Sequence, residues 1–258
     1  MDKQAQAAAK HNRMMHEPVE KLVMSLAVPT ILSMLVTAVY SMADTFFVSR
    51  LGTQATGGVG ICFSVMAIIQ AIGFTFGQGA GNTVSRLLGR QDRQAAVTVA
   101  STGFFTAMAV SALLAIAGSF FVDPLVRLLG ATETIAPYAA DYLRYLLLGM
   151  PFIATSFTLN NLLRYQGSAA YAMVGIMAGA ILNIALDPLL IYTFEMGVGG
   201  AALATAISQM ISFAILMLQS ARGGNILPSL RHFSLSPALH AAIIKNGSPT
   251  LLRQGLAS

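Results

Sequence analysis

Two aspartates stand in stretches of sequence that otherwise carry almost no charge. Asp44 comes four residues after Tyr40, and Asp187 comes four residues after Asn183 and directly before Pro188. Residues four positions apart share one face of a helix. A carboxylate that shares a helix face with a hydroxyl or an amide is suited to binding a cation or a proton. The two pairs are therefore candidate cation or proton sites.

Each aspartate also has a structural interpretation. Arg50 follows Asp44 closely, so Asp44 could end a helix at the outer membrane interface. Asp187 could mark a helix terminus, since Pro188 removes a backbone donor. The same proline could instead kink the helix and free carbonyl groups for a cation. Asn183 lies a full turn deeper than Asp187, which favours the cation-site interpretation there, whereas both interpretations of Asp44 stay open.

The placement of the two carboxylates suggests a shared role. Both lie in the outer half of apolar segments that run outward, so a single cavity could hold them. An ionisable residue inside a membrane span costs free energy and therefore calls for an explanation. A pair of this kind could take up a proton from outside and release it when its surroundings change. We interpret the pair as the possible basis of cation-driven antiport.

Other residues give weaker signals. Hydroxyl side chains such as Thr205 and Ser208 usually bond to the backbone of their own helix. Tyr142 suits an outer membrane interface, where tyrosine is common. The sequence has no Gly-rich phosphate loop and no nucleophile motif, and none of its four histidines pairs with Cys or carboxylates at metal-ligand spacing. We therefore predict no enzyme, no cofactor, and no metal beyond a possible Na⁺ at the aspartates.

The elements that must position these residues are membrane helices. Of 258 residues, 55% are hydrophobic and only 10% are charged, whereas soluble domains carry about a quarter charged residues. A bilayer core needs about 20 apolar residues per helical span. A helix satisfies its own backbone hydrogen bonds in lipid. We predict an all-α membrane protein, a six-transmembrane-helix bundle, with spans near residues 22–48, 55–80, 95–121, 136–159, 169–194 and 201–219.

The basic residues predict the orientation. With the N-terminus inside, the inner segments hold eleven Lys and Arg residues and the outer segments hold three. Cytoplasmic loops carry the excess of positive charge in membrane proteins. We expect a multi-pass protein of the cytoplasmic membrane with a cytoplasmic N-terminus. The net charge of +5 then reflects topology, and we expect no nucleic-acid partner.

The sequence divides into four parts. Residues 1–21 form a polar cytoplasmic segment, and residues 22–220 form the six-helix unit. Residues 221–247 form a cytoplasmic linker, either amphipathic and lying on the membrane surface or an ordinary loop with a short helix that starts near Pro237. Residues 248–258 read as the start of a seventh helix. Their Ser-Pro-Thr-Leu-Leu resembles the Val-Pro-Thr-Ile-Leu of residues 28–32, and internal repeats are common in transporters.

Several separated motifs cover nearly the whole chain. They are Pro29-Thr-Ile-Leu-Ser-Met-Leu, Tyr40-Ser-Met-Ala-Asp44-Thr-Phe-Phe-Val-Ser-Arg-Leu-Gly52, Gly77-Gln-Gly-Ala-Gly81, Ser85-Arg-Leu-Leu-Gly89, Asn183-Ile-Ala-Leu-Asp187-Pro-Leu-Leu-Ile and Gly199-Gly-Ala-Ala-Leu-Ala-Thr205. In type and order these motifs resemble one transporter family, multidrug and toxic compound extrusion (MATE), in its DinF-like and MepA-like branches.

The resemblance implies a twelve-helix fold of two six-helix lobes, of which this chain is the N-terminal lobe and the first turns of the second. It implies secondary active efflux of cationic or amphipathic compounds in exchange for H⁺ or Na⁺. The lobe's acidic cation site would contain Asp44, Asp187, Asn183, Tyr40, Thr205 and Tyr142. Pro29 matches a proline where the first helix bends during coupling. The expected partners are the bilayer, small cationic or amphipathic drugs and the missing C-terminal lobe.

Two other functions fit a bundle of this kind. A flippase for lipid-linked precursors, from the same wider fold group, would carry basic residues in its central cavity, whereas these spans carry carboxylates. A membrane scaffold or channel subunit that oligomerises would not need the repeat at Pro249.

Overall fold

The computed structural model describes residues 3–257 and consists of helices and their connections in that range. Six helices, between 24 and 37 residues long, are long and apolar enough to cross a membrane. This confirms the predicted all-α bundle of six spans. The spans are α2 (Val19–Ser49), α3 (Thr53–Gly89), α4 (Arg93–Phe120), α6 (Ala136–Tyr165), α7 (Ala169–Pro188) with the π-helix η1 (Leu189–Thr193), and α8 (Gly197–Ser220).

Two helices extend further than the apolar pattern predicts. Helix α3 runs past Ala80 to Gly89, and α6 runs past Leu159 to Tyr165. Their last turns carry Arg86 and Arg164. Arginine is a good helix former, so these helices continue after the apolar stretch ends. Hydropathy therefore predicts which part of a helix lies in lipid, but it does not predict the residue at which the helix ends.

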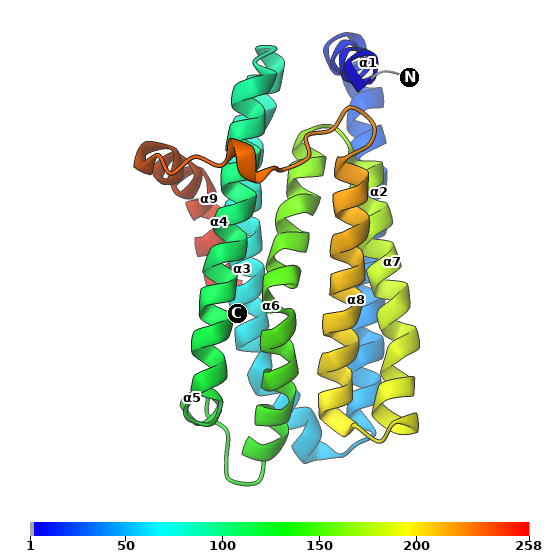
Figure 1. Ribbon diagram of the computed structural model, residues 1–258. Coiled ribbons are helices and arrows are strands. Elements are labelled where there is room, and N and C mark those ends of the chain that lie inside the picture. Colours follow the sequence, from blue (N-terminus) through cyan, green and yellow to red (C-terminus); the bar gives the residue numbers. More distant parts are fainter. Residues whose placement is uncertain (1–2, 258) are drawn as a thin grey trace.

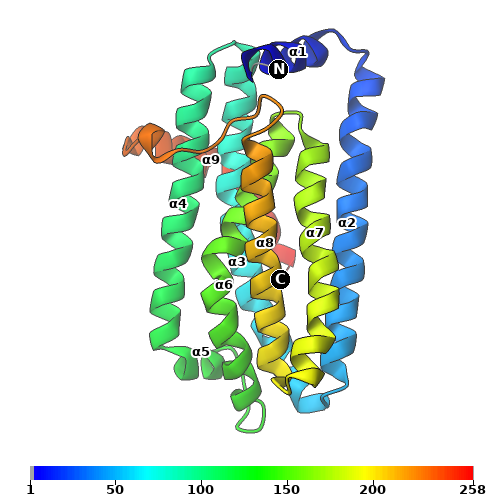
Figure 2. The same ribbon diagram turned by 45° about the vertical axis from the view of Figure 1, so that its right-hand side comes forward.

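Four short or flanking elements complete the described chain. They are α1 (Lys3–His16), α5 (Val122–Leu128), the 3₁₀-helix η2 (Leu230–His232) and α9 (Pro237–Ala257). Helix α1 lies across one end of the bundle, and α5 lies at the opposite end (Figures 1 and 2). Helix α9 starts at Pro237, as expected for proline in a first turn. It continues through Pro249, which therefore lies inside a helix and not at the start of a new one.

The packing order places α6 at the centre of the bundle. Helices α3, α4 and α8 contact α6, α7 packs on α8, and α2 packs mainly on α7 (Figure 1). Glycines allow close approach at these contacts, as is usual between membrane helices. A Cβ atom at Gly73 would lie 2.6 Å from the Ala154 carbonyl oxygen of α6, and one at Gly149 would lie 2.8 Å from the Ala206 side chain of α8.

Helix α9 packs against α3 through glycines and polar side chains. A Cβ at Gly79 of α3 would collide with the Ile243 carbonyl oxygen, and one at Gly247 would collide with the Thr75 carbonyl oxygen. The Thr250 hydroxyl donates a hydrogen bond to Gln78 at 2.7 Å. The linker therefore passes from a coil into a helix that is held closely against a span.

Candidate functional site

Asp44 faces the interior of the bundle. Of the residues of α2, only Ser33, Asp44 and Val48 are buried, while most of its large apolar side chains are exposed. Asp44 is 8% exposed, and its helix continues to Ser49. A helix that buries so little and yet buries a carboxylate holds it against its neighbour. The structure thus does not place Asp44 at an exposed helix end.

Asp187, Asn183 and Thr205 form a buried hydrogen-bonded group between α7 and α8. The Asn183 amide nitrogen donates to Asp187 Oδ1 and to Thr205 Oγ1, each at 3.3 Å. The three residues are 0%, 2% and 4% exposed, respectively. The prediction that Asn183 and Asp187 share one helix face is confirmed. Thr205 contacts a neighbouring helix, so the expectation that it bonds only to its own backbone is wrong.

Pro188 changes the helix directly after Asp187. Proline has no N–H, so the Ile184 carbonyl receives no regular helical hydrogen bond. The chain continues as the π-helix η1. From this segment the Tyr192 hydroxyl donates to the Phe47 carbonyl oxygen of α2 at 2.7 Å. The irregular turn therefore anchors the end of α7 to the helix that carries Asp44.

The structure brings the two carboxylates and two tyrosines together. Asp44 and Asp187 are close enough for their charges to interact, and both interact with Tyr40 and Tyr142. Tyr142, from α6, is 2% exposed. The interpretation of Tyr142 as an outer-interface tyrosine is wrong, because the side chain turns inward toward the carboxylates. The six predicted site residues thus come from α2, α6, α7 and α8 and meet in one region.

Several oxygen atoms in this region are buried and have no hydrogen-bond partner in the described part of the chain. They are Asp44 Oδ1, Asn183 Oδ1, Asp187 Oδ2 and Ser208 Oγ. Buried polar atoms are normally paired, so each unpaired one calls for an explanation. A carboxylate can bind a proton, and amide or hydroxyl oxygens can then accept a hydrogen bond from the protonated group. The same oxygens can instead coordinate a cation such as Na⁺. Ser208 does not bond to its own helix, contrary to expectation.

A small cavity of about 40 Å³ adjoins this region and is lined by both polar and apolar side chains. Tyr40 and Thr37 line it from α2, Ser156 and Asn160 from α6, and Gln209 from α8. Sequence reasoning identified only Tyr40 here. A single serine or asparagine in an apolar segment has no distinguishing pattern, and only the packing of three helices shows that these residues meet.

Pro29 lies inside α2, which runs without interruption from Val19 to Ser49. The Ser33 hydroxyl donates to the Pro29 carbonyl oxygen at 2.7 Å. In the described residues no group of three or more His, Cys, Asp or Glu side chains could hold a metal ion. A cation held here would therefore depend on the two aspartates with amide and hydroxyl oxygens.

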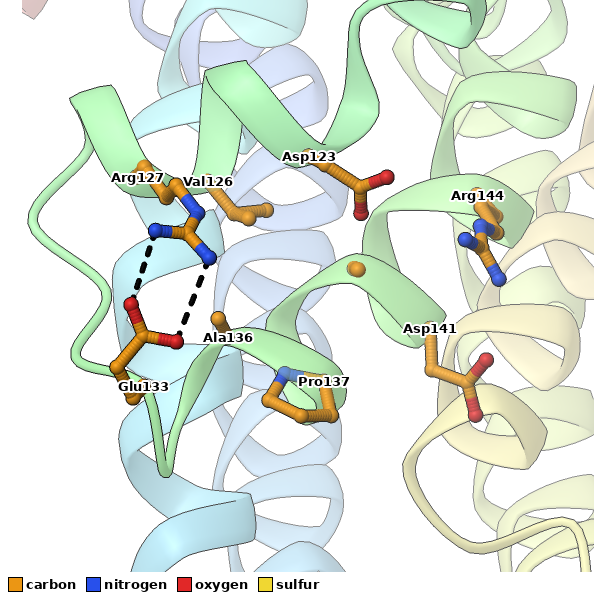
Figure 3. Close-up of a pocket in the computed structure, with 9 residues that line it drawn as sticks. Asp123, Val126, Arg127, Glu133, Ala136, Pro137, Asp141 and Arg144 are labelled. Carbon is orange, nitrogen blue, oxygen red and sulfur yellow. Dashed lines mark hydrogen bonds and ion pairs between the residues drawn. The ribbon is translucent and has the colours of Figure 1, made fainter.

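A second group of charges lies at the same end of the bundle but on its surface. A groove of about 490 Å³ is bordered by Asp123, Arg127, Glu133, Asp141 and Arg144 (Figure 3). The Arg127 guanidinium donates to both Glu133 carboxylate oxygens, at 2.9 and 3.3 Å. These charges are exposed and of both signs. The groove shares no residue with the buried carboxylate region.

Comparison with known proteins places these features in one family. The sequence model of the family MatE matches residues 29–189. The multidrug export protein MepA of Staphylococcus aureus (strain MRSA252) is 28% identical over 237 residues, which are 91% of this chain and 52% of that protein. MepA of Staphylococcus saprophyticus is also 28% identical, over 234 residues.

Solved structures give the same result. A multidrug resistance MATE transporter in an outward-facing conformation has a TM-score of 0.83 at 31% identity, covering 91% of this chain and 52% of its own. A MOP superfamily transporter from Pyrococcus furiosus, whose binding pocket of reverse polarity suggests a different function, has a TM-score of 0.85 at 30% identity, covering 94% and 54%. The chain spans about half the length of the curated relatives it matches.

Proposed function

The chain belongs to the MATE family of multi-pass membrane transporters, as its N-terminal lobe, and we propose that it forms the cation-coupled half of a multidrug exporter. The complete transporter would export cationic or amphipathic compounds by antiport with H⁺ or Na⁺. Its second lobe would supply the other wall of the substrate path. The N-terminus would be cytoplasmic and the protein would lie in the cytoplasmic membrane, in keeping with the basic residues of its inner segments.

The observation that carries this proposal is the buried pair Asp44 and Asp187. Both carboxylates are almost completely shielded, and each has an oxygen with no hydrogen-bond partner among the residues that the structure describes. Carboxylates inside membrane proteins commonly mark ion or proton pathways. In the described residues, no Lys or Arg side chain forms a salt bridge with Asp44 or Asp187. A bound H⁺ or Na⁺ would supply the missing positive charge.

The arrangement supports a simple coupling mechanism. With its carboxylates charged, the site attracts a cation from the outer side. Binding of one H⁺ or Na⁺ neutralises one of the two negative charges and weakens the repulsion between Asp44 and Asp187, so α2 and α7 can pack more closely. Since α2 is otherwise held by few buried contacts, a change at Asp44 can shift this helix relative to the bundle. Movement of α2 would change the substrate path and so link cation entry to drug exit.

Replacement of the carboxylates tests the site. In the full-length protein we expect Asp44→Asn and Asp187→Asn each to abolish drug export without loss of expression. Asp141→Asn serves as the matched control. It removes an exposed carboxylate of α6 at the same end of the bundle as the buried pair. Drug susceptibility of cells and protein level on immunoblots are the measurements. Normal resistance in cells that carry either buried-site variant would defeat the assignment.

The coupling ion requires a separate experiment. Everted membrane vesicles with the full-length protein would be given a pH gradient or a Na⁺ gradient, one at a time. Drug uptake driven by one gradient alone identifies the ion. Uptake with neither gradient, but with ATP, would contradict secondary active transport.

A further inference from the structure

A large cavity lies at the end of the bundle opposite to the carboxylate pair. It has a volume of about 660 Å³ and lies between α1 and the adjoining ends of α3, α4 and α6. Helix α1 crosses this end of the bundle from α2 toward α3 and α4 (Figure 2), and its residues Lys10 and His11 line the cavity. The side chains that carry the argument are Lys10, His11, Gln91, Arg93 and Tyr165. No Asp or Glu lines the cavity in the described residues.

Two cationic side chains in this cavity have only neutral partners. The Lys10 ammonium donates to Ser168 Oγ and to Asn225 Oδ1. The Arg93 guanidinium donates to the backbone carbonyl oxygens of Gly224 and Asn225, at 3.0 and 3.2 Å. The salt bridges of the described chain, Arg13–Glu17 and Arg127–Glu133, involve neither residue. Lys10 and Arg93 are therefore held in place without a neutralising charge.

The electrostatics of Lys10 show that this arrangement is unfavourable when the cavity holds no anion. Burial lowers the pKa of the Lys10 ammonium to about 8, and the positive charge of Arg93 lowers it as well. At neutral pH the lysine is still mostly protonated, so two like charges share one wall. An anion would remove the repulsion and replace lost hydration.

We propose that this cavity binds a phosphate-bearing anion, with Lys10 and Arg93 as its cationic contacts. Lysine and arginine are the usual partners of phosphate. Gln91 and Tyr165 add donors on the same lining, and the volume is ample for a phosphate group. Arg93 begins α4 and Tyr165 ends α6, so the cavity lies at the ends of two candidate spans, where lipid headgroups would meet the protein in a membrane. The anion is thus either the headgroup of an anionic lipid or a soluble phosphate compound.

The contacts also assign a task to the bound anion. Lys10 belongs to α1, Arg93 begins α4, and their partners belong to the segments after α6 and α8. An anion between the two cations would join α1 to the rest of the bundle at this end. Because α1 leads directly into α2, the occupied cavity would also restrain the start of that helix.

Thermal unfolding of the purified chain in a zwitterionic detergent would test the proposal. The transition temperature would be followed during titration with inorganic phosphate, with phosphatidylglycerol, and with phosphatidylcholine as the comparison lipid, which is zwitterionic and has no net charge. Sodium chloride at equal ionic strength separates specific binding from screening. The variants are Lys10→Gln, Lys10→Arg and, as the matched control, Lys21→Gln, which removes an exposed lysine outside the cavity.

We expect the anion to raise the transition temperature of the unaltered chain and of Lys21→Gln. In Lys10→Gln the apparent Kd should weaken about tenfold, as for loss of one charge-assisted contact. Lys10→Arg should keep most of the response. Without the anion, Lys10→Gln should unfold at the same or a higher temperature, because a buried charge is gone.

The two sources of the anion give different patterns. A response to inorganic phosphate and to phosphatidylglycerol shows that a phosphate group is sufficient, whereas a response to phosphatidylglycerol alone assigns the site to a lipid headgroup. Either pattern supports the proposal if it weakens in Lys10→Gln. The proposal is overturned if neither anion acts beyond sodium chloride, or if Lys10→Gln responds like Lys21→Gln.

Discussion

At the scale of single residues, the Asn183 amide connects the carboxylate pair to the rest of the bundle. Its nitrogen donates to Asp187 and to Thr205, so it links an ionisable group on α7 to a hydroxyl on α8. The orientation of Asp187 therefore depends on a neutral neighbour. The Thr205 hydroxyl accepts the hydrogen bond from Asn183. Substitutions that keep either the hydroxyl or the shape of the side chain can therefore separate the effect of the hydrogen bond from that of packing.

Thr205→Val and Thr205→Ser make this separation. Valine keeps the shape of threonine but removes the acceptor, so we expect a loss of about 0.5–1.5 kcal/mol, the usual net value of one hydrogen bond. In a chain of this size the transition temperature should fall by about 2–4 °C per kcal/mol. Thr205→Ser keeps the hydroxyl and should keep the bond to Asn183. Thermal unfolding of the chain measures both.

Drug export by the full-length variants provides the functional readout. We expect Thr205→Ser to export near the normal rate and Thr205→Val to export more slowly, because Asn183 then holds Asp187 alone. Equal export by both variants would show that the hydroxyl has no part in the site.

Single functional residues could be predicted where burying the side chain in an apolar span costs free energy. Asp44 and Asp187 were identifiable because a carboxylate in an apolar span demands a reason. Ser156 and Asn160 were not, because such residues also occur in spans as ordinary packing. Tyr142 was misjudged from its residue type alone, since tyrosine is common both at interfaces and next to buried polar groups.

At the scale of helices, glycine positions decide which pairs approach closely. Gly79 and Gly247 lie where α3 and α9 bring backbone against backbone. The sequence shows many glycines but not which helix each one faces. Pro237 and Pro188 were better guides, because proline limits hydrogen bonding locally and so fixes where a helix begins or changes. That the chain continues as a π-helix after Pro188, and that Tyr192 of this segment bonds to the Phe47 carbonyl oxygen, could not be predicted from the sequence.

Gly79→Ala should loosen α9 from α3. The added methyl group would collide with the Ile243 carbonyl oxygen, which belongs to a backbone and cannot turn away. Overpacking of this kind costs about 1–3 kcal/mol. We expect a lower transition temperature and faster hydrogen exchange of the amides of residues 241–247.

Gly60→Ala is the matched control for this substitution. Gly60 is an exposed glycine of the same helix, and a Cβ there meets nothing within 4 Å. The stability of the Gly60→Ala variant should stay the same or rise slightly, because alanine stabilises a helix more than glycine does. Similar destabilisation by both substitutions would contradict the proposal that the effect of Gly79→Ala comes from its contact with α9.

At the scale of the whole molecule, the number of spans followed from the sequence and their arrangement did not. Long stretches with few charged residues define the six spans, because any charged side chain in the lipid costs free energy wherever it lies in a span. The central position of α6 and the outer position of α2 depend on which faces fit together. Polar Thr and Asn residues made α6 look the least apolar of the spans, and this is consistent with its being the most buried.

The orientation in the membrane is the remaining prediction at this scale, and cysteine labelling tests it. Cys62 is completely buried, so the unaltered chain should not react with a membrane-impermeant maleimide and serves as the blank. Two positions are suited to new cysteines. Glu133, at the α5 end of the bundle, has a side chain that is 80% exposed, and Leu235, in the linker, is 82% exposed.

With a cytoplasmic N-terminus, the α5 end faces outward and the linker faces the cytoplasm. Glu133→Cys should therefore react in right-side-out vesicles, and Leu235→Cys only in everted vesicles or after permeabilisation. The physical reason is the excess of Lys and Arg in the segments on the linker side, since basic loops are retained in the cytoplasm. The reverse pattern would place the N-terminus outside. It would also put the buried aspartates near the cytoplasmic surface, so that a coupling cation would enter from the wrong side for export.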